Sequence, residues 1–329
     1  MSADEKALSR ASETYGASIR ERRVRAAARL DEIAARDARI GEIASEMRLA
    51  GLAAVRAAME DVPEDVEKRV RSIAEHNLAL QTERSDRLRA LGYPEDYLYA
   101  GPFCGVCGDT GYHDGAMCGC FQPFYIRALG DQIDEAVGKG FPTFETFNMS
   151  IFTASVAIPD AGSRAERMAV VQKCRDYAGM LGATSENLLL RGESGRGKTT
   201  LAVCIAREAV RRGVGVLYIS APALFSLREE ERFRRDEEAG AELARYRVCD
   251  ALVLDDVGLE ATAPMNAPTL LSLLTAREAA GLPTILCTAL YGKDLSGRYS
   301  TAVASRLEND FKAIELRGLD LRRMLKTTV

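Results

Sequence analysis

The apolar residues of the first hundred positions recur at helical spacing in two series. Pro63 separates the series, and alanine fills many of the remaining semi-apolar positions. The pattern predicts a helical hairpin or short bundle over residues 1–100, whose helices either pack closely or keep a face for a partner. The series are Leu30, Ile33, Ile40, Ile43, Met47 and Leu49, then Val66, Val70, Ile73, Leu80, Leu88 and Leu91, before Gly92 and Pro94.

From about residue 126 the pattern changes to short apolar runs that alternate with helical stretches. Short buried strands separated by helices are typical of a parallel sheet covered on both faces. We therefore expect an α/β domain over residues 126–329. The five predicted strands are Asn187–Gly192, Gly215–Ser220, Ala251–Asp256, Pro283–Thr288 and Lys312–Leu316.

Between these two regions, residues 101–125 are rich in glycine and cysteine and have almost no apolar periodicity. Such a segment cannot build its own core, and Cys104, Cys107, Cys118 and Cys120 offer four thiolates in the tetrahedral set that Zn²⁺ prefers. We expect one structural zinc ion here. The Cys-x-Cys spacing of the second pair is tight, so His113 is an alternative to Cys118 or Cys120. A redox-active pair is less favoured because no thioredoxin-like strand precedes it.

Composition narrows the function classes further. The chain has 329 residues with 44 Lys and Arg against 48 Asp and Glu, a net charge of −4, so any nucleic-acid contact must be a local patch. Two histidines argue against catalytic triads and multi-histidine metal centres. No stretch approaches the roughly 20 apolar residues of a membrane span, and the amino terminus has no signal core. We expect a cytoplasmic protein with no membrane partner.

Cysteines 174, 204, 249 and 287 are scattered among apolar residues, and we interpret them as buried small hydrophobic side chains. The charged run Arg228–Glu238 is mixed in sign, and we interpret it as a solvated helix face.

A phosphate-binding motif follows the first predicted strand. Residues 192–199 fit GxxxxGK[ST], in which glycines let backbone N–H groups surround phosphates and the helix after the loop points its positive end at the anion. Lys198 is expected to reach the β- and γ-phosphates of ATP, and Thr199 to bind Mg²⁺. The predicted nucleotide-binding residues here are Gly192, Glu193, Ser194, Gly195, Arg196, Gly197, Lys198, Thr199 and Thr200.

Two acidic residues end the third predicted strand. A carboxylate at the tip of a strand beside the phosphate loop is what Mg²⁺ requires, and Asp255 fits that role. Asp256 is then placed to polarise the attacking water. The sequence therefore predicts ATP and Mg²⁺ as ligands, with Asp256 as a catalytic residue.

The order of these motifs resembles the DnaC/DnaI-type helicase-loader ATPases, in the form with an N-terminal zinc-binding region. The matching segments include GYPEDYL, CGVCGDTGYHDGAMCGCF, FETFN, GESGRGKTTL, LVLDDVGLE, PTILCT and ASRL. The resemblance implies an AAA+ fold with a five-stranded parallel sheet of order 5-1-4-3-2. It also implies ATP as the switch, the hexameric replicative DNA helicase and single-stranded DNA as partners, and an ATP-dependent homo-oligomer.

The same resemblance assigns further roles. Glu260 matches a catalytic acidic residue, and Arg306 matches the arginine of a motif near the subunit interface. Arg322 is the candidate C-terminal sensor arginine that contacts nucleotide, and the segment Phe144–Phe147 lies where relatives cover the adenine.

Two departures from the family pattern bear on hydrolysis. The fourth strand in relatives ends in a Thr-Asn pair, whereas here it ends in Thr288-Ala289, so γ-phosphate sensing is weakened or left to Thr288. Relatives also often carry an arginine where this chain has Ala302. Arg306 or Arg298 must then act across a subunit interface, or the arginine-finger step is lost.

Three functions follow from these observations. The first is a helicase-loading ATPase with a partner-binding region over 1–100, a zinc segment over 101–125 and an ATPase domain over 126–329. The second is a transposition helper ATPase of the IstB type, which has a similar ATPase core. The third is an ATP-gated binding switch with little turnover, which the alanines at 289 and 302 suggest.

Overall fold

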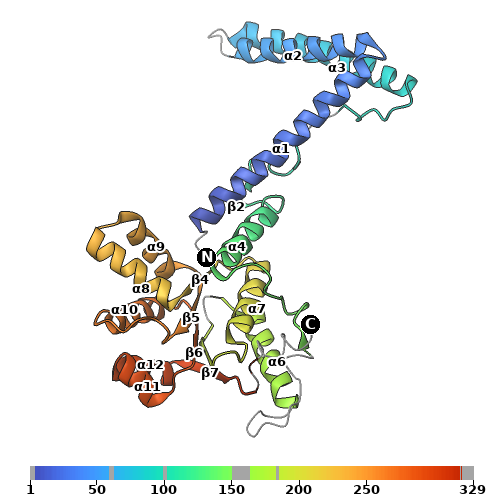
Figure 1. The fold of residues 1–329 in the computed structure, drawn as a ribbon. Coiled ribbons are helices and arrows are strands. Elements are labelled where there is room, and N and C mark those ends of the chain that lie inside the picture. Colours follow the sequence, from blue (N-terminus) through green and yellow to red (C-terminus); the bar gives the residue numbers. More distant parts are fainter. Residues whose placement is uncertain are drawn as a thin grey trace. The chain divides into compact units, whose positions relative to one another are not determined.

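The computed structural model describes residues 4–58, 63–98, 102–149, 164–182, 185–318 and 320. These residues form two compact units (Figure 1). The helical unit is Glu13–Cys120, and the core unit combines Met1–Ser12 with Phe121–Val329. Within the described ranges, no helix is long and apolar enough to cross a membrane.

A five-stranded parallel sheet forms the centre of the core unit. Its order is β4-β5-β6-β3-β7, which is 2-3-4-1-5 when the strands of this sheet are numbered along the chain. Read from the other edge this is the predicted order 5-1-4-3-2, and the five predicted strands and the AAA+ type of fold are confirmed. The strands are β3 (Asn187–Arg191), β4 (Val216–Ser220), β5 (Ala251–Val257), β6 (Thr284–Thr288) and β7 (Phe311–Glu315).

Helices cover both faces of this sheet, as Figure 1 shows. One face packs against α7 (Lys198–Arg211), with α4 (Gln122–Val137) and α6 (Arg164–Met180) beside it. The other face shares one apolar core with α8 to α12. These helices are α8 (Ala221–Glu229), α9 (Glu237–Val248), α10 (Asn266–Ala279), α11 (Gly292–Arg298) and α12 (Thr301–Asn309).

The charged run Arg228–Glu238 is mostly exposed, as expected, but it does not form a single helix face. The helix α8 changes to a π-helical turn, η1 (Glu230–Arg234), and ends where Arg235 adopts a left-handed φ of 53°. The Asp236 carboxylate then accepts hydrogen bonds from the backbone N–H groups of Glu238 and Ala239. A side chain that satisfies the free N–H groups of a helix start favours a new helix, and α9 begins here.

The helical unit contains most of α1 (Glu5–Ala34), together with α2 (Ala38–Ala58) and α3 (Pro63–Ala90). The break predicted at Pro63 coincides with the start of α3, whose first residue is Pro63. A second break, at residues 35–37, was not predicted. There the Asp37 carboxylate accepts a hydrogen bond from the backbone N–H of Arg39 at 3.0 Å. The Arg39 guanidinium also bonds both carboxylate oxygens of Glu83 on α3, at 2.9 and 3.1 Å. These bonds and a small core of Ile33, Ile40 and Leu88 hold the helices together.

The loop that carries the four clustered cysteines contains a two-stranded hairpin and completes the helical unit. The hairpin strands are β1 (Tyr112–His113) and β2 (Ala116–Met117), which pair antiparallel. Strands this short contribute little stability of their own. The loop therefore depends on other contacts or on a ligand for its structure.

The first turn of α1 belongs to the core unit. The Asp4 carboxylate accepts hydrogen bonds from Arg245 on α9 at 2.7 Å and from Gln132 on α4 at 2.9 Å. Ala7 and Ala11 are fully buried in the same unit. The amino-terminal residues thus join two core helices that lie far apart in the sequence.

Arg277 on α10 is a fully buried cation of the core unit. Its guanidinium donates to the carbonyl oxygens of Tyr246 at 2.9 Å, Cys249 at 3.0 Å and Pro283 at 2.8 Å, and to the Thr284 hydroxyl at 3.0 Å. It therefore satisfies the backbone groups at the end of α9 and before β6. A buried charge is tolerated only when it is hydrogen-bonded in this way.

We predict that Arg277→Ala lowers the free energy of unfolding by about 3 kcal/mol, because several buried carbonyl groups lose their donor at ~1–3 kcal/mol each. Urea denaturation followed by circular dichroism measures the change. The matched control is Arg211→Ala, since the Arg211 side chain is 70% exposed and forms an ion pair with Glu208. A loss of about 0.5 kcal/mol or less is expected for this variant. Equal losses in the two variants would contradict the assigned role of Arg277.

Candidate nucleotide and zinc sites

The phosphate loop joins the end of β3 to the start of α7. Two of its glycines occupy positions that disfavour a side chain: Gly192 because backbone lies close to it, and Gly195 because of its φ, since the Asp320 carboxylate near it is the movable end of a side chain. A Cβ at Gly192 would lie 2.4 Å from the carbonyl oxygen of Leu316, and one at Gly195 would lie 2.0 Å from a carboxylate oxygen of Asp320. Both glycines also have positive φ, at 154° and 81°. The motif glycines are therefore needed for the loop geometry in this chain.

Lys198 is the first residue of α7, and its side chain folds over the loop. Its ammonium donates to the carbonyl oxygens of Gly192 at 2.6 Å and Glu193 at 3.0 Å. The residue is only 9% exposed. A cation held inside a loop at a helix N-terminus is suited to bind phosphate groups, and Thr199 follows it directly.

Asp255 is buried at the end of β5, and its two carboxylate oxygens have different donors. Tyr218 on the neighbouring β4 donates its hydroxyl to Oδ2, and the backbone N–H of Asp256 donates to Oδ1 at 2.8 Å. Burial and the adjacent carboxylate raise the pKa of Tyr218, so its hydroxyl keeps the proton that it donates. Tyr218 therefore orients the residue expected to bind Mg²⁺.

Asp256 lies at an irregularity in the sheet. The register between β5 and β6 shifts between Leu254 and Val257, and Asp256 has a φ of 55°, which is uncommon for a residue other than glycine. Bulges re-aim side chains next to active sites. The two consecutive aspartates therefore have different environments, since Asp255 is fixed by Tyr218 and Asp256 occupies the bulge.

Glu260 and Arg298 are paired within one chain. Arg298 approaches Oε1 of Glu260 at 3.3 Å, and Tyr299 donates to the same oxygen at 2.7 Å. The backbone N–H of Gly258 donates to Oε2 at 3.0 Å. Arg298 also donates to the Thr262 hydroxyl at 2.6 Å. In this arrangement Glu260 fixes the segment after β5, and Arg298 is engaged in its own subunit.

Three further predicted site residues, Thr288, Arg306 and Arg196, have defined partners. Thr288 donates its hydroxyl to the carbonyl oxygen of Val257 at 2.7 Å and is 1% exposed, so it joins the ends of β6 and β5. Arg306 on α12 forms an ion pair with Glu278 on α10. Arg196 forms an ion pair with Glu193 inside the loop. Ser194 and Thr200 lie in the same loop-to-helix segment, and Arg322 lies outside the described residues.

The Phe144–Phe147 segment precedes the core sheet. Phe144 is 5% exposed. The guanidinium of Arg175 on α6 lies 5.4 Å from its ring centroid and donates to its carbonyl oxygen at 3.0 Å. Phe144 is thus packed against α6, and its expected contact with adenine stays a prediction.

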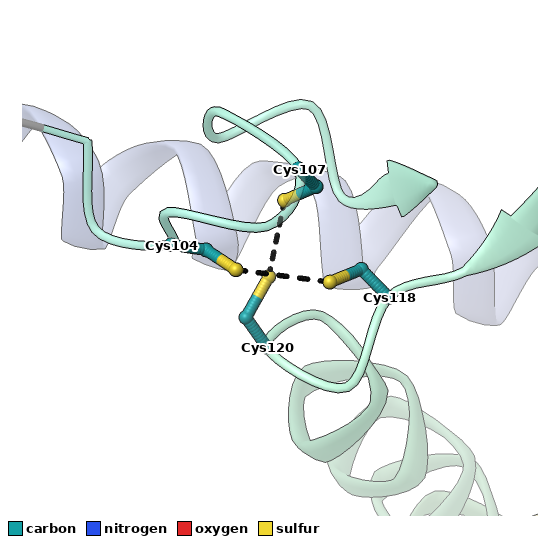
Figure 2. A group of neighbouring side chains, drawn as sticks. All are labelled: Cys104, Cys107, Cys118 and Cys120. Atoms are coloured by element: carbon teal, nitrogen blue, oxygen red, sulfur yellow. Dashed lines mark hydrogen bonds between the residues drawn. The ribbon is translucent and has the colours of Figure 1, made fainter. Parts of the chain in front are cut away.

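The four cysteines of the loop come together in the helical unit, and Figure 2 shows their sulfur atoms pointing toward one another. All four sulfurs lie within 4.8 Å of one another, with 3.7 Å between Cys104 and Cys118 and 3.4 Å between Cys107 and Cys120. Sulfurs at about 2.3 Å from a tetrahedral Zn²⁺ are about 3.8 Å apart, so this donor set fits the ion. His113 is not in the cluster, and its ring lies 3.3 Å from Asp114.

Residues 146–293, fewer than half of the chain, match the family model described as IstB-like ATP binding protein. A putative insertion-sequence ATP-binding protein of Pseudomonas fluorescens is 36% identical over 105 residues, which are 32% of this chain and 44% of the relative. A putative insertion-sequence ATP-binding protein of Sinorhizobium fredii is 31% identical over 148 residues, which are 42% of this chain and 57% of the relative. The chain spans about half the length of the curated relatives it matches.

Solved structures give weaker likenesses. The crystal structure of DnaI is 24% identical, with a TM-score of 0.41, and the alignment covers 54% of this chain and 94% of that one. The crystal structure of the DnaC helicase loader is 20% identical, with a TM-score of 0.42, and the alignment covers 46% of this chain and 90% of that one. The family match, the strand order and the phosphate loop together describe the core unit: it is an ATP-binding P-loop domain of AAA+ type, similar to the IstB-like ATP-binding proteins.

We predict that Lys198→Ala abolishes measurable ATP binding, because its ammonium supplies the charge that neutralises the β- and γ-phosphates. Fluorescence titration with a labelled ATP analogue measures the affinity, and circular dichroism checks the fold. Lys312→Ala is the control, since that lysine is 65% exposed on β7. Undiminished affinity in Lys198→Ala would refute the assignment of the loop.

Proposed function

We propose that this protein is an ATP-hydrolysing helper that acts on DNA together with a second protein, in the manner of a transposition helper ATPase. The supporting observation is the match of residues 146–293 to the IstB-like family, which includes the phosphate loop, Asp255 and Asp256. The sequence-based interpretation placed helicase loading first. The curated relatives favour the transposition helper, because they are insertion-sequence ATP-binding proteins.

Helicase loading is the second candidate, and one observation favours it. The helical unit and its cysteine cluster lie outside the residues that match the IstB-like family. A region with no counterpart in that match is free to serve a different partner. In the helicase-loading hypothesis, this partner is the replicative DNA helicase, which the chain places on single-stranded DNA.

An exposed apolar face on α2 supports binding of a second protein by the helical unit. Leu49, Leu52 and Val55 are 63%, 56% and 60% exposed, and their spacing of three residues puts them on one side of the helix. The buried residues of α2, including Ile40 and Ile43, face the other way toward α3. Apolar side chains gathered on an exposed face are typical of protein interfaces.

We predict that the immobilised full-length chain retains a transposase encoded with it and does not retain the replicative helicase. Leu52→Glu is expected to reduce partner retention about tenfold, because a charge enters the apolar face. Val24→Glu is the control, since Val24 is a 68% exposed residue of α1. Retention of purified helicase, lost in Leu52→Glu, would establish the loader instead.

Single-stranded DNA is the second partner in this proposal, and η1 offers a contact. Phe233 is 73% exposed, and the guanidinium of Arg232 lies 5.7 Å from its ring centroid. Exposed aromatic rings with neighbouring arginines bind single strands by stacking on bases, and π-helical turns often occur at functional sites.

Phe233→Ala is expected to weaken binding of a labelled oligonucleotide at least fivefold, since one base stack contributes ~1–3 kcal/mol. Fluorescence anisotropy measures the affinity at fixed salt. Leu259→Ala is the control, because Leu259 is an exposed apolar residue of the same unit at 66%. If the two variants bind equally well, η1 is not the DNA contact.

Hydrolysis is proposed to depend on assembly of several subunits. Arg298 is engaged by Glu260, so Arg306 is the better candidate to reach the ATP of a neighbouring subunit. To do so it must leave Glu278. An arginine supplied across an interface contributes roughly 10³–10⁵ in rate where it operates. Isolated subunits would therefore hydrolyse ATP slowly.

We predict that single-stranded DNA or the partner protein stimulates hydrolysis, and that Arg306→Ala removes the stimulation while ATP binding persists. Steady-state phosphate release and ATP-analogue titration measure the two properties. Arg317→Ala, at a side chain that is 69% exposed, is the control. A parent protein that shows no stimulation under any assembling condition would favour a slow ATP-gated switch.

A further inference from the structure

Helix α1 has one buried side chain over a long exposed stretch. Between Glu13 and Arg29, Tyr15 is the residue that is buried, at 4% exposure, while the others are exposed or partly exposed. Val24 in the same stretch is 68% exposed. A large polar aromatic residue at such a position needs a partner for its hydroxyl group.

The partner of the Tyr15 hydroxyl is the cysteine cluster. Its oxygen lies 3.2 Å from the sulfur of Cys120 and 4.0 Å from that of Cys107. The Tyr15 ring packs edge-on against Phe103, with centroids 6.2 Å apart and planes at 85°. Phe103 directly precedes Cys104 in the sequence. The tyrosine thus contacts the cluster through its hydroxyl and the chain before the cluster through its ring.

The chemistry of a four-thiolate site explains this geometry. Four thiolates around Zn²⁺ leave two net negative charges on the sulfurs, and these charges are stabilised by N–H and O–H donors around the site. The Tyr15 hydroxyl is placed to be such a donor, and it comes from a helix outside the cysteine loop. A cluster of neutral thiols would have no comparable need for a donor.

We propose that Tyr15 donates a hydrogen bond to the zinc-bound thiolate of Cys120 and is a positioning residue of the metal site. The zinc ion then fastens α1 to the cysteine loop, because the one buried side chain of this part of the helix bonds a metal ligand. The inference rests on zinc binding by the four cysteines. It is independent of the choice between transposition helper and helicase loader.

The test compares full-length Tyr15→Phe with the parent protein. Phenylalanine keeps the ring against Phe103 and removes only the hydroxyl. Residues that hydrogen-bond metal ligands typically contribute 10–100-fold to metal affinity, so we expect zinc affinity, measured by competition with a chromogenic chelator, to fall at least tenfold. Tyr112→Phe is the matched control, since Tyr112 belongs to the same loop and is 45% exposed.

Cobalt substitution provides a readout that a packing role would not change. The sulfur-to-cobalt charge-transfer band reports the electron density on the thiolates, so it should shift in Tyr15→Phe and not in Tyr112→Phe. Unchanged affinity and an unchanged band in Tyr15→Phe would overturn the proposal. Metal analysis that finds no zinc in the parent protein would overturn it together with the zinc site. Full zinc occupancy in Cys118→Ser would show that the ligand set is wrong and overturn it as well.

Discussion

The carboxyl end of β3 is held from both sides, and the position of the phosphate loop depends on this constraint. The N–H of Gly192 donates to the carbonyl oxygen of Thr288 at the end of β6, at 3.2 Å. On the other side, the N–H of Leu316 after β7 donates to the carbonyl oxygen of Arg191 at 2.7 Å. Because the strands are parallel, their carboxyl ends lie on the same side of the sheet, and Asp255 of β5 lies there too. The phosphate loop, Asp255 and the segment after β7 therefore meet without any long connection.

Much of this core was predictable because its signals are local. Each strand is a short apolar run, and the phosphate loop is a contiguous motif, so both were found from the residues alone. The strand order is different, because no run of residues encodes which strands are neighbours. It came from the resemblance in motif order, and the structure confirmed it. The cysteine cluster was also predictable, since its four ligands lie within one loop.

Several contacts that were not predicted join distant segments. Tyr218 is one residue of an apolar strand, and only the pairing of β4 with β5 brings its hydroxyl to Asp255. The partner of Arg306 is on another helix, α10, and that of Arg298 follows β5. A run of charges such as Arg228–Glu238 suggested a helix face because charge composition does not reveal a left-handed residue or a capping aspartate.

The ion pair of Asp4 with Arg245 has a consequence for how the chain folds during synthesis. The two residues are 241 positions apart, so a ribosome that adds 5–20 residues per second needs about 10–50 s between them. During that interval Glu13–Cys120 is already available to fold, whereas the first turn of α1 waits for α9. The residues around Asp4 thus reach their native contacts only after α9 has been made. Their protection from proteases would report that α9 has docked onto the core.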